Sequence, residues 1–157
     1  PGFPSLQDDD WLWGGSLETI NETLHVGIRW DANDDTRFND MPAFGRDEIL
    51  ERDGINDVVQ YVLSFNGRET DKAAATRGME VFADNCASCH GEDAKGVQEL
   101  GAPNLTDAIW LYGGDAAAIT ETVTNSRGGV MPAWGGRLDE ETIKMLTVYV
   151  HSLGGGQ

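Results

Sequence analysis

The sequence contains two copies of one pattern, and this repeat limits the fold more than any other feature. The stretch 4–15 returns at 103–114 with an offset of 99 residues (103 − 4), including Trp-Leu followed by an aromatic residue and Gly-Gly. Met41-Pro42-Ala43-Phe44-Gly45 returns as Met131-Pro132-Ala133-Trp134-Gly135 with an offset of 90 (131 − 41). The smaller offset predicts an insertion of nine residues (99 − 90) within 30–39, an Asp- and Asn-rich stretch typical of a surface loop.

Each copy ends in a segment whose apolar residues recur at helical spacing, which indicates an amphipathic helix. These residues are Ile55, Val58, Val59, Val62 and Leu63 in the first copy, and Ile143, Leu146, Val150 and Leu153 in the second. Asp139 is placed to cap the second helix, and Asn66-Gly67 to end the first. Strand patterns are absent. We therefore expect an all-α fold of two helical lobes, at residues 1–68 and 69–157.

The second lobe is expected to open with a helix capped by Thr70, running through Ala73, Met79 and Phe82 into Cys86. Met79 and Met145 both fall on helical segments, where methionine usually fills the core, and we expect both to be buried. Subtracting the offset of 99 from 86 gives −13, a position upstream of Pro1. The first lobe is therefore expected to lack its N-terminal helix and its own cysteine motif.

Cys86-Ala87-Ser88-Cys89-His90 has the C-x-x-C-H pattern of covalent haem attachment. In that chemistry Cys86 and Cys89 each bind a haem vinyl group, and His90 becomes the proximal iron ligand. A zinc site needs further Cys or His ligands, but the other histidines, His25 and His151, have no ligand spacing, and we expect them on surfaces or helix faces. A thioredoxin-like site needs a β-α-β context, which the pattern does not offer.

Met131 follows His90 by 41 residues (131 − 90) within Gly128-Gly129-Val130-Met131-Pro132 and is the favoured sixth iron ligand. Glycine lets the backbone approach the ring, and proline stiffens the turn. A thioether opposite histidine raises the reduction potential and leaves no open site for oxygen chemistry. Such iron is suited to outer-sphere electron transfer.

Other residues are expected around the haem. The Pro103 carbonyl is placed to accept the ring N–H of His90, and Arg127 is a candidate partner for a haem propionate, although a solvated surface arginine is an equal alternative. Trp110, Tyr112 and Trp134 are expected to wall the haem and exclude water, with ordinary core filling as the alternative.

The formal net charge is −16, from 11 Lys and Arg against 27 Asp and Glu. This balance excludes nucleic acid as a partner, because phosphate binding needs a basic surface. Acidic runs at 8–10 and 139–141 suit a basic protein partner, with an ordinary solvated surface as the alternative. No apolar run approaches the roughly 18 residues needed to span a bilayer.

With these residues in hand, the chain resembles the membrane-anchored dihaem cytochrome c subunit of cbb3-type cytochrome c oxidases. The resemblance covers both lobes in family order. It is carried by the cysteine motif, the two Met-Pro-Ala stretches, Asp9-Asp10-Trp11-Leu12-Trp13-Gly14-Gly15, and Ile109-Trp110-Leu111-Tyr112-Gly113-Gly114.

The resemblance implies two tandem class I cytochrome c-like lobes on the periplasmic side of the bacterial inner membrane. It implies two haems c in the complete subunit, of which one is held covalently by this chain, and membrane attachment through an N-terminal helix that this chain lacks. The implied partners are the catalytic subunit and the monohaem cytochrome subunit of the oxidase and a donor cytochrome c. Electrons would pass through this subunit to the oxygen-reducing site elsewhere.

The identity of the sixth ligand remains open between two methionines. Met131 follows the usual chain order of a cytochrome c and is preferred as the ligand opposite His90, with Met41 serving the haem of the other lobe. If the lobes exchange ligands, Met41 instead faces His90.

Three other functions remain as alternatives. A free dihaem cytochrome c shuttle is distinguished by the absence of a membrane helix in the longer gene. A peroxidase or gas sensor needs an open axial position. A thiol-disulfide or zinc module would not retain haem after acid extraction.

Overall fold

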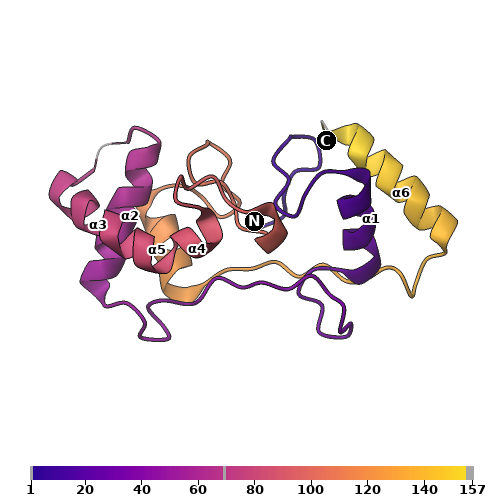
Figure 1. Cartoon of the computed structure of the whole chain (residues 1–157), viewed down its shortest axis with the longest axis horizontal. Coiled ribbons are helices and arrows are strands. Elements are labelled where there is room, and N and C mark those ends of the chain that lie inside the picture. The colour runs from indigo at the N-terminus through magenta and orange to yellow at the C-terminus, as the bar shows by residue number, and fades with distance from the viewer. Residues whose placement is uncertain (1, 69, 155–157) are drawn as a thin grey trace. The chain divides into compact units, whose positions relative to one another are not determined.

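The computed structural model describes residues 2–68 and 70–154. Within these ranges the regular elements are helices, joined by long loops with only isolated β-bridges, which confirms the all-α prediction (Figure 1). The helices are α1 (Leu17–Val26), α2 (Arg52–Phe65), α3 (Lys72–Asn85), α4 (Ala87–His90), α5 (Ala116–Asn125), α6 (Glu140–Leu153) and the 3-10 helix η1 (Gln98–Leu100). None of the helices in the described ranges has the length and apolar character needed to cross a membrane.

Most of the predicted helix ends are confirmed. The Asp139 carboxylate accepts a hydrogen bond from the Thr142 backbone N–H at 2.7 Å and caps α6. Gly67, with φ of 64°, follows α2 in the left-handed conformation. The predicted cap at Thr70 was wrong: the carboxylate of Asp71 accepts from two backbone N–H groups and starts α3 one residue later.

The described residues form two compact units, each of which combines segments from both halves of the sequence. Unit 1 contains the described residues of Asp40–Val97 and Ala102–Gly128, with Gly2. Unit 2 contains the described residues of Phe3–Asn39, Gln98–Gly101 and Gly129–Gln157. The compact units therefore differ from a division of the chain near residue 68.

The two Met-Pro-Ala loops explain how the segments are combined. In unit 1, the N–H of Gly45 donates to the carbonyl of Thr124, at the end of α5, at 3.2 Å. In unit 2, the N–H of Gly135 donates to the carbonyl of His25, in α1, at 3.2 Å. Each loop thus docks on the helix of the other repeat, and the helix that follows it packs there too.

Unit 1 is built around the contact of α2 with α3 and α5. Its core comprises Phe44, Ile55, Val58, Val59, Val62, Leu63, Phe82, Ala94, Ile119 and Val123. The two long helices approach closely at Gly78, where an added Cβ would lie 2.0 Å from the backbone oxygen of Asp57. This approach positions α3, which leads directly into the cysteine motif.

Unit 2 is held by the contact of α1 with α6. Ile20 and Ile143 are buried there, and the buried Thr147 hydroxyl accepts a hydrogen bond from Asn21 Nδ2 at 3.1 Å. The insertion in the first copy is a loop, as predicted. Near the end of this loop, the backbone N–H of Arg37 donates to the carbonyl of Gly27, the residue that ends α1, at 3.1 Å.

The expectation that Met79 and Met145 are core residues was wrong, since they are 51% and 65% exposed. On α3 the buried residues are Ala74, Gly78 and Phe82, which recur every four residues and form one face. Met79 lies outside this face, and its side chain is exposed. On α6 the buried residues are Ile143 and Thr147, and Met145 lies midway between them, on the opposite face.

Candidate functional site

The cysteine motif lies in unit 1 and forms a single helical turn. Cys86 ends α3, and its carbonyl accepts hydrogen bonds from the backbone N–H groups of Cys89 at 3.1 Å and His90 at 2.9 Å. Cys86 and Cys89 are both half-buried free thiols. The turn therefore presents two thiols and one imidazole from five consecutive residues.

The His90 ring has a fixed orientation. The residue is 9% exposed, and Nδ1 lies 3.0 Å from the backbone oxygen of Pro103. Because a carbonyl only accepts hydrogen bonds, Nδ1 carries the proton and Nε2 keeps its lone pair. Burial lowers the pKa of His90, against a smaller opposing effect of the Pro103 hydrogen bond, and this direction favours the neutral ring. A neutral imidazole with a free Nε2 is the form that binds iron.

The loop after His90 brings Pro103 back to the ring. The N–H of Gly96 donates to the carbonyl of His90 at 2.7 Å, and the N–H of Leu105 donates to the carbonyl of Ala94 at 2.8 Å. Gly96 has a φ of 83°, and an added Cβ would lie 2.3 Å from the oxygen of Ala102. Only glycine fits at this crossing, which makes Gly96 a site residue that the sequence analysis missed.

The environment of the thiols does not favour thiol exchange. Burial raises the pKa of Cys86 to about 11, and the charge of Cys89 adds to the effect. Catalytic thiols depend on the opposite shift, because the thiolate is the nucleophile. Neither thiol is engaged in a disulfide. The two cysteines therefore fit a role as covalent attachment points better than a role in redox exchange.

Unit 1 contains most of the predicted haem environment. Trp110 packs against its core, and the indole N–H donates to the carbonyl of Asp107 at 3.2 Å. The Arg127 guanidinium lies over the Tyr112 ring, 4.7 Å from its centroid. Trp134, in contrast, lies in unit 2 under Arg137, at 4.6 Å.

The two candidate methionines also lie in different units. Met41 belongs to unit 1, with His90, and packs half-buried against the hydrophobic core of that unit beside the buried Ala43 and Phe44. Met131 belongs to unit 2, where its backbone exchanges hydrogen bonds with Ile28 in both directions, each at 2.9 Å. The compact unit around His90 thus contains the methionine of the first repeat.

Arg127 has a counterpart, Arg37, that the sequence analysis missed. Arg127 donates to the Thr122 hydroxyl and the Tyr112 carbonyl, while Arg37 donates to the Thr23 hydroxyl and the Trp13 carbonyl. Arg37 also lies over the Trp13 ring, 5.0 Å from its centroid. The offset of 90 between 37 and 127 was available in the sequence and relates these arginines directly.

Unit 2 therefore repeats the contacts that Arg127 makes in unit 1. It also holds one buried side-chain donor without a partner among the described residues, the indole Nε1 of Trp11. Trp11 is the repeat counterpart of Trp110. An unsatisfied buried donor costs roughly 1–3 kcal/mol, and a hydrogen bond to a bound group would remove this cost.

Comparison with known proteins places these features in a family. Residues 73–150 match the family described as "Cytochrome C oxidase, cbb3-type, subunit III". The chain is 55% identical to the cbb3-type cytochrome c oxidase subunit CcoP of Cereibacter sphaeroides, covering 99% of this chain and 54% of that protein.

Two further relatives agree. The chain is 59% identical to the subunit FixP of Azorhizobium caulinodans, covering 99% of this chain and 53% of that protein, and 58% identical to CcoP of Rhodobacter capsulatus, covering 99% and 55%. The chain spans about half the length of the curated relatives that it matches. Together with the C-x-x-C-H turn, these similarities establish that the chain belongs to the family of subunit III of cbb3-type cytochrome c oxidases.

Proposed function

We propose that this chain holds covalently bound haem c and transfers electrons within a cbb3-type terminal oxidase. The observation that carries the proposal is the orientation of His90, whose Nδ1 is 3.0 Å from the Pro103 carbonyl and whose ring follows two free thiols on one turn. These donors fit haem c, which needs two thioether links and a neutral imidazole. Haem c, when bound, supplies a redox centre that exchanges one electron at a time.

Different residues of unit 1 have different proposed roles in binding haem. Cys86 and Cys89 would attach haem covalently, and His90 would bind its iron through Nε2 while the Pro103 carbonyl holds the orientation of the imidazole. Trp110 and Tyr112 would shield the haem from water. Arg127 already donates to protein oxygens through Nε and Nη2, so its proposed contact with a propionate would add to a structural role at the end of α5.

We further propose that Met41, rather than Met131, is the sixth ligand opposite His90. The exchange of the two Met-Pro-Ala loops supports this choice, because the loop of Met41 docks on α5 of the unit that contains His90. By the same argument Met131 would serve a haem bound by the first repeat in the longer protein. The preference for Met131 based on chain order is thereby reversed.

Replacement of each methionine by leucine tests this assignment. We expect Met41→Leu to abolish the low-spin spectrum of the haem attached to Cys86 and Cys89, and Met131→Leu to preserve it when this chain is matured with haem. Loss of that spectrum with Met131→Leu alone would restore the ligand order of an ordinary cytochrome c. Met79→Leu, at an exposed position, is the matched control.

The proposed partners follow from the family. A donor cytochrome c would supply electrons on the periplasmic side of the inner membrane. The catalytic subunit of the oxidase would accept them, and the monohaem subunit would belong to the same electron-transfer path. The net charge of −16 supports a basic donor. The main alternative, a free dihaem shuttle, is tested by copurification: the full-length subunit should remain with the oxidase in detergent, and a shuttle should wash away.

Haem stoichiometry tests the cofactor proposal itself. We expect one covalent haem for this chain and two for the full-length protein, measured after acid extraction of unbound haem. Replacing Cys86 and Cys89 with serine should remove the covalent haem from this chain. Acid-stable haem at full stoichiometry in that double variant would refute the attachment site, and carbon monoxide binding to the reduced protein would favour a haem enzyme or gas sensor.

A further inference from the structure

The outer face of α6 carries three exposed hydrophobic side chains in unit 2. Met145 is 65% exposed, Val148 59% and Tyr149 60%. They line a shallow groove together with Lys144 and Ser152. Within the described part of unit 2, α1 is the only helix with a substantial contact to α6, and it lies against the opposite side, at Ile143 and Thr147.

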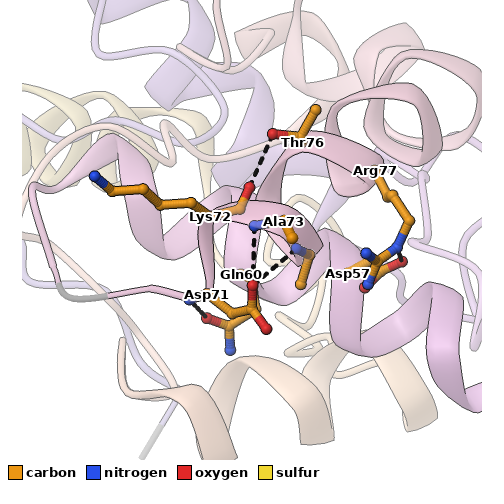
Figure 2. Close-up of polar contacts among 8 residues, drawn as sticks. Asp57, Gln60, Asp71, Lys72, Ala73, Thr76 and Arg77 are labelled. Carbon is orange, nitrogen blue, oxygen red and sulfur yellow. Dashed lines mark hydrogen bonds and ion pairs between the residues drawn. The ribbon is translucent and has the colours of Figure 1, made fainter.

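The repeat shows what such a face does in the other unit. The helices α2 and α6 both have 14 residues, and their first residues differ by 88 (140 − 52), so Met145, Val148 and Tyr149 correspond to Asp57, Gln60 and Tyr61. In unit 1 each of these three positions contacts α3 or its capping residue, Asp71. Arg77 binds Asp57, and the Asp71 N–H donates to Gln60 at 3.0 Å (Figure 2). The Tyr61 and Phe82 rings lie 5.5 Å apart.

The two helices differ in exposure on this face. Asp57 is only 7% exposed, and Gln60 and Tyr61 are half-buried, whereas their counterparts on α6 are open. Asn56 and Ser64 lie beside this face on α2 and remain exposed although α3 is present. Their counterparts on α6, Lys144 and Ser152, are also exposed. The outer face of α6 thus resembles that of α2 with its covering helix removed.

We propose that this face is the docking site for a helix of the longer protein, equivalent to α3 and located before the first repeat. Two observations identify this occupant. The repeat offset of 99 places the counterpart of Lys72–Asn85 upstream of Pro1. The chain also spans about half the length of its relatives, which leaves ample sequence for such a helix. This inference rests on the repeat and is independent of which methionine binds iron.

The residues of α6 define the chemistry of the partner helix. Met145 replaces the charged Asp57, so the position equivalent to Arg77 should be apolar, because an arginine there would lose its ion pair. The position equivalent to Gly78 should also be Gly, since any Cβ there would meet the backbone of the facing helix. An aromatic residue should occupy the position equivalent to Phe82 and contact Tyr149.

Cysteine labelling of the full-length, haem-loaded subunit tests the coverage. We expect Met145→Cys and Val148→Cys to react with a maleimide at least about tenfold more slowly than Lys144→Cys and Ser152→Cys, because a docked helix must open first. All four should react equally in denaturant, with each site quantified by peptide mass spectrometry. Equal labelling of the four positions in the native subunit would overturn the proposal.

Photo-crosslinking identifies the occupant. With benzoylphenylalanine in place of Tyr149 in the full-length subunit, we expect crosslinks to a peptide upstream of Pro1 in the same chain. Crosslinks to a second copy, to another oxidase subunit or to no protein at all would each refute the docked helix. As a second measurement, Val148→Asp should lower the thermal midpoint of the full-length subunit, whereas Lys144→Asp should leave it nearly unchanged.

Discussion

Arg77 binds Asp57 through two hydrogen bonds between α3 and α2, with Nε 2.7 Å from Oδ2 and Nη2 2.6 Å from Oδ1. Figure 2 shows this paired geometry. Asp57 is 7% exposed, so its carboxylate depends on the arginine for much of its solvation. We expect Arg77→Met to lower the free energy of unfolding, because it leaves the buried Asp57 carboxylate without its charged donor.

Urea unfolding of the haem-loaded protein measures this effect. The matched control is Arg68→Met, which removes a positive charge at an exposed position between the two helices. A control as destabilised as Arg77→Met would mean that net charge, rather than the paired contact, is responsible.

The same pair makes stability depend on pH. The hydrogen bond from Arg77 is the main cause that lowers the pKa of Asp57 below its ordinary value, with burial acting in the opposite direction. The native state therefore binds the proton more weakly than the unfolded chain, whose Asp pKa is about 3.9. The contribution is fully present above that pKa and is lost as the pH falls through the lower native value.

Unfolding of the native protein and Asp57→Asn from pH 6 to pH 2 measures this dependence. The stability advantage of the native protein should be constant above about pH 5 and shrink below about pH 4. An advantage that grows on acidification would contradict the assignment of the lowered pKa.

Much of the helical fold could be predicted from the sequence, because local patterns determine it. The periodic segments around Ile55 and Ile143 became α2 and α6, and Asp139 caps the second of them as expected. The approach of Pro103 to His90 also followed from local spacing, since only a short loop separates them. The cap of α3 was misplaced by one residue because Thr70 and Asp71 are both good capping residues.

The combination of segments into units could not be predicted in this way. Met41 and Met131 have nearly the same local sequence, so either loop satisfies the pattern of a ligand-bearing turn. The choice depends on contacts such as those of Gly45 with Thr124 and Gly135 with His25, which are distant in sequence. Arg37 was missed for another reason: it lies in the insertion-bearing loop, where the repeat offset changes from 99 to 90.

The close approach of α2 and α3 makes Gly78 sensitive to substitution. An added Cβ would lie 2.0 Å from the backbone oxygen of Asp57 and 2.9 Å from the Cβ of Tyr61. We expect Gly78→Ala to separate the helices and lower the free energy of unfolding by about 1–3 kcal/mol. Thermal unfolding followed by circular dichroism measures the change.

Gly54 in α2 is the matched control, because its nearest neighbour to an added Cβ is Leu50 Cδ2 at 3.8 Å. Gly54→Ala should raise stability by roughly 0.5–1 kcal/mol, as expected for a helical position with space. If both variants are stabilised, the two helices are less tightly packed than the structure indicates.

Because Arg37 and Arg127 make equivalent contacts in the two units, we expect their substitution to lower the stability of the protein by similar amounts. Each guanidinium donates to a threonine hydroxyl and to a backbone carbonyl of the aromatic residue on which it stacks. Arg37→Met and Arg127→Met should each cost about 1–3 kcal/mol of stability, since these acceptors lose charged donors. Arg137→Met removes only a stacking contact with Trp134 and should cost about 0.5–1 kcal/mol.

Differential scanning calorimetry of the three variants checks this order. A small effect of Arg127→Met, with a large change in the reduction potential of the bound haem, would instead favour a role dominated by a haem propionate. Equal small effects at all three arginines would mean that each is a solvated surface residue.

The acidic surface predicts a strong dependence of electron transfer on salt. Asp9 and Glu141 belong to two acidic runs of unit 2 and are exposed. Attraction between these charges and a basic donor cytochrome should accelerate encounter, and salt should screen it beyond about 10 Å at 0.1 M. We expect the association rate, measured by stopped-flow reduction of the haem-loaded protein, to fall by at least about tenfold from low to high ionic strength.

Variants that replace acidic residues with neutral ones show whether the salt dependence of the association rate comes from one local surface. The double variant Asp9→Asn and Glu141→Gln should flatten the salt dependence more than Glu80→Gln and Asp84→Asn, which remove the same charge from the exposed side of α3 in unit 1. Asp139 must be kept in both proteins, because its carboxylate caps α6. Equal flattening would mean that the net charge of −16 steers the donor without a preferred docking face, because long-range attraction depends on the summed charge.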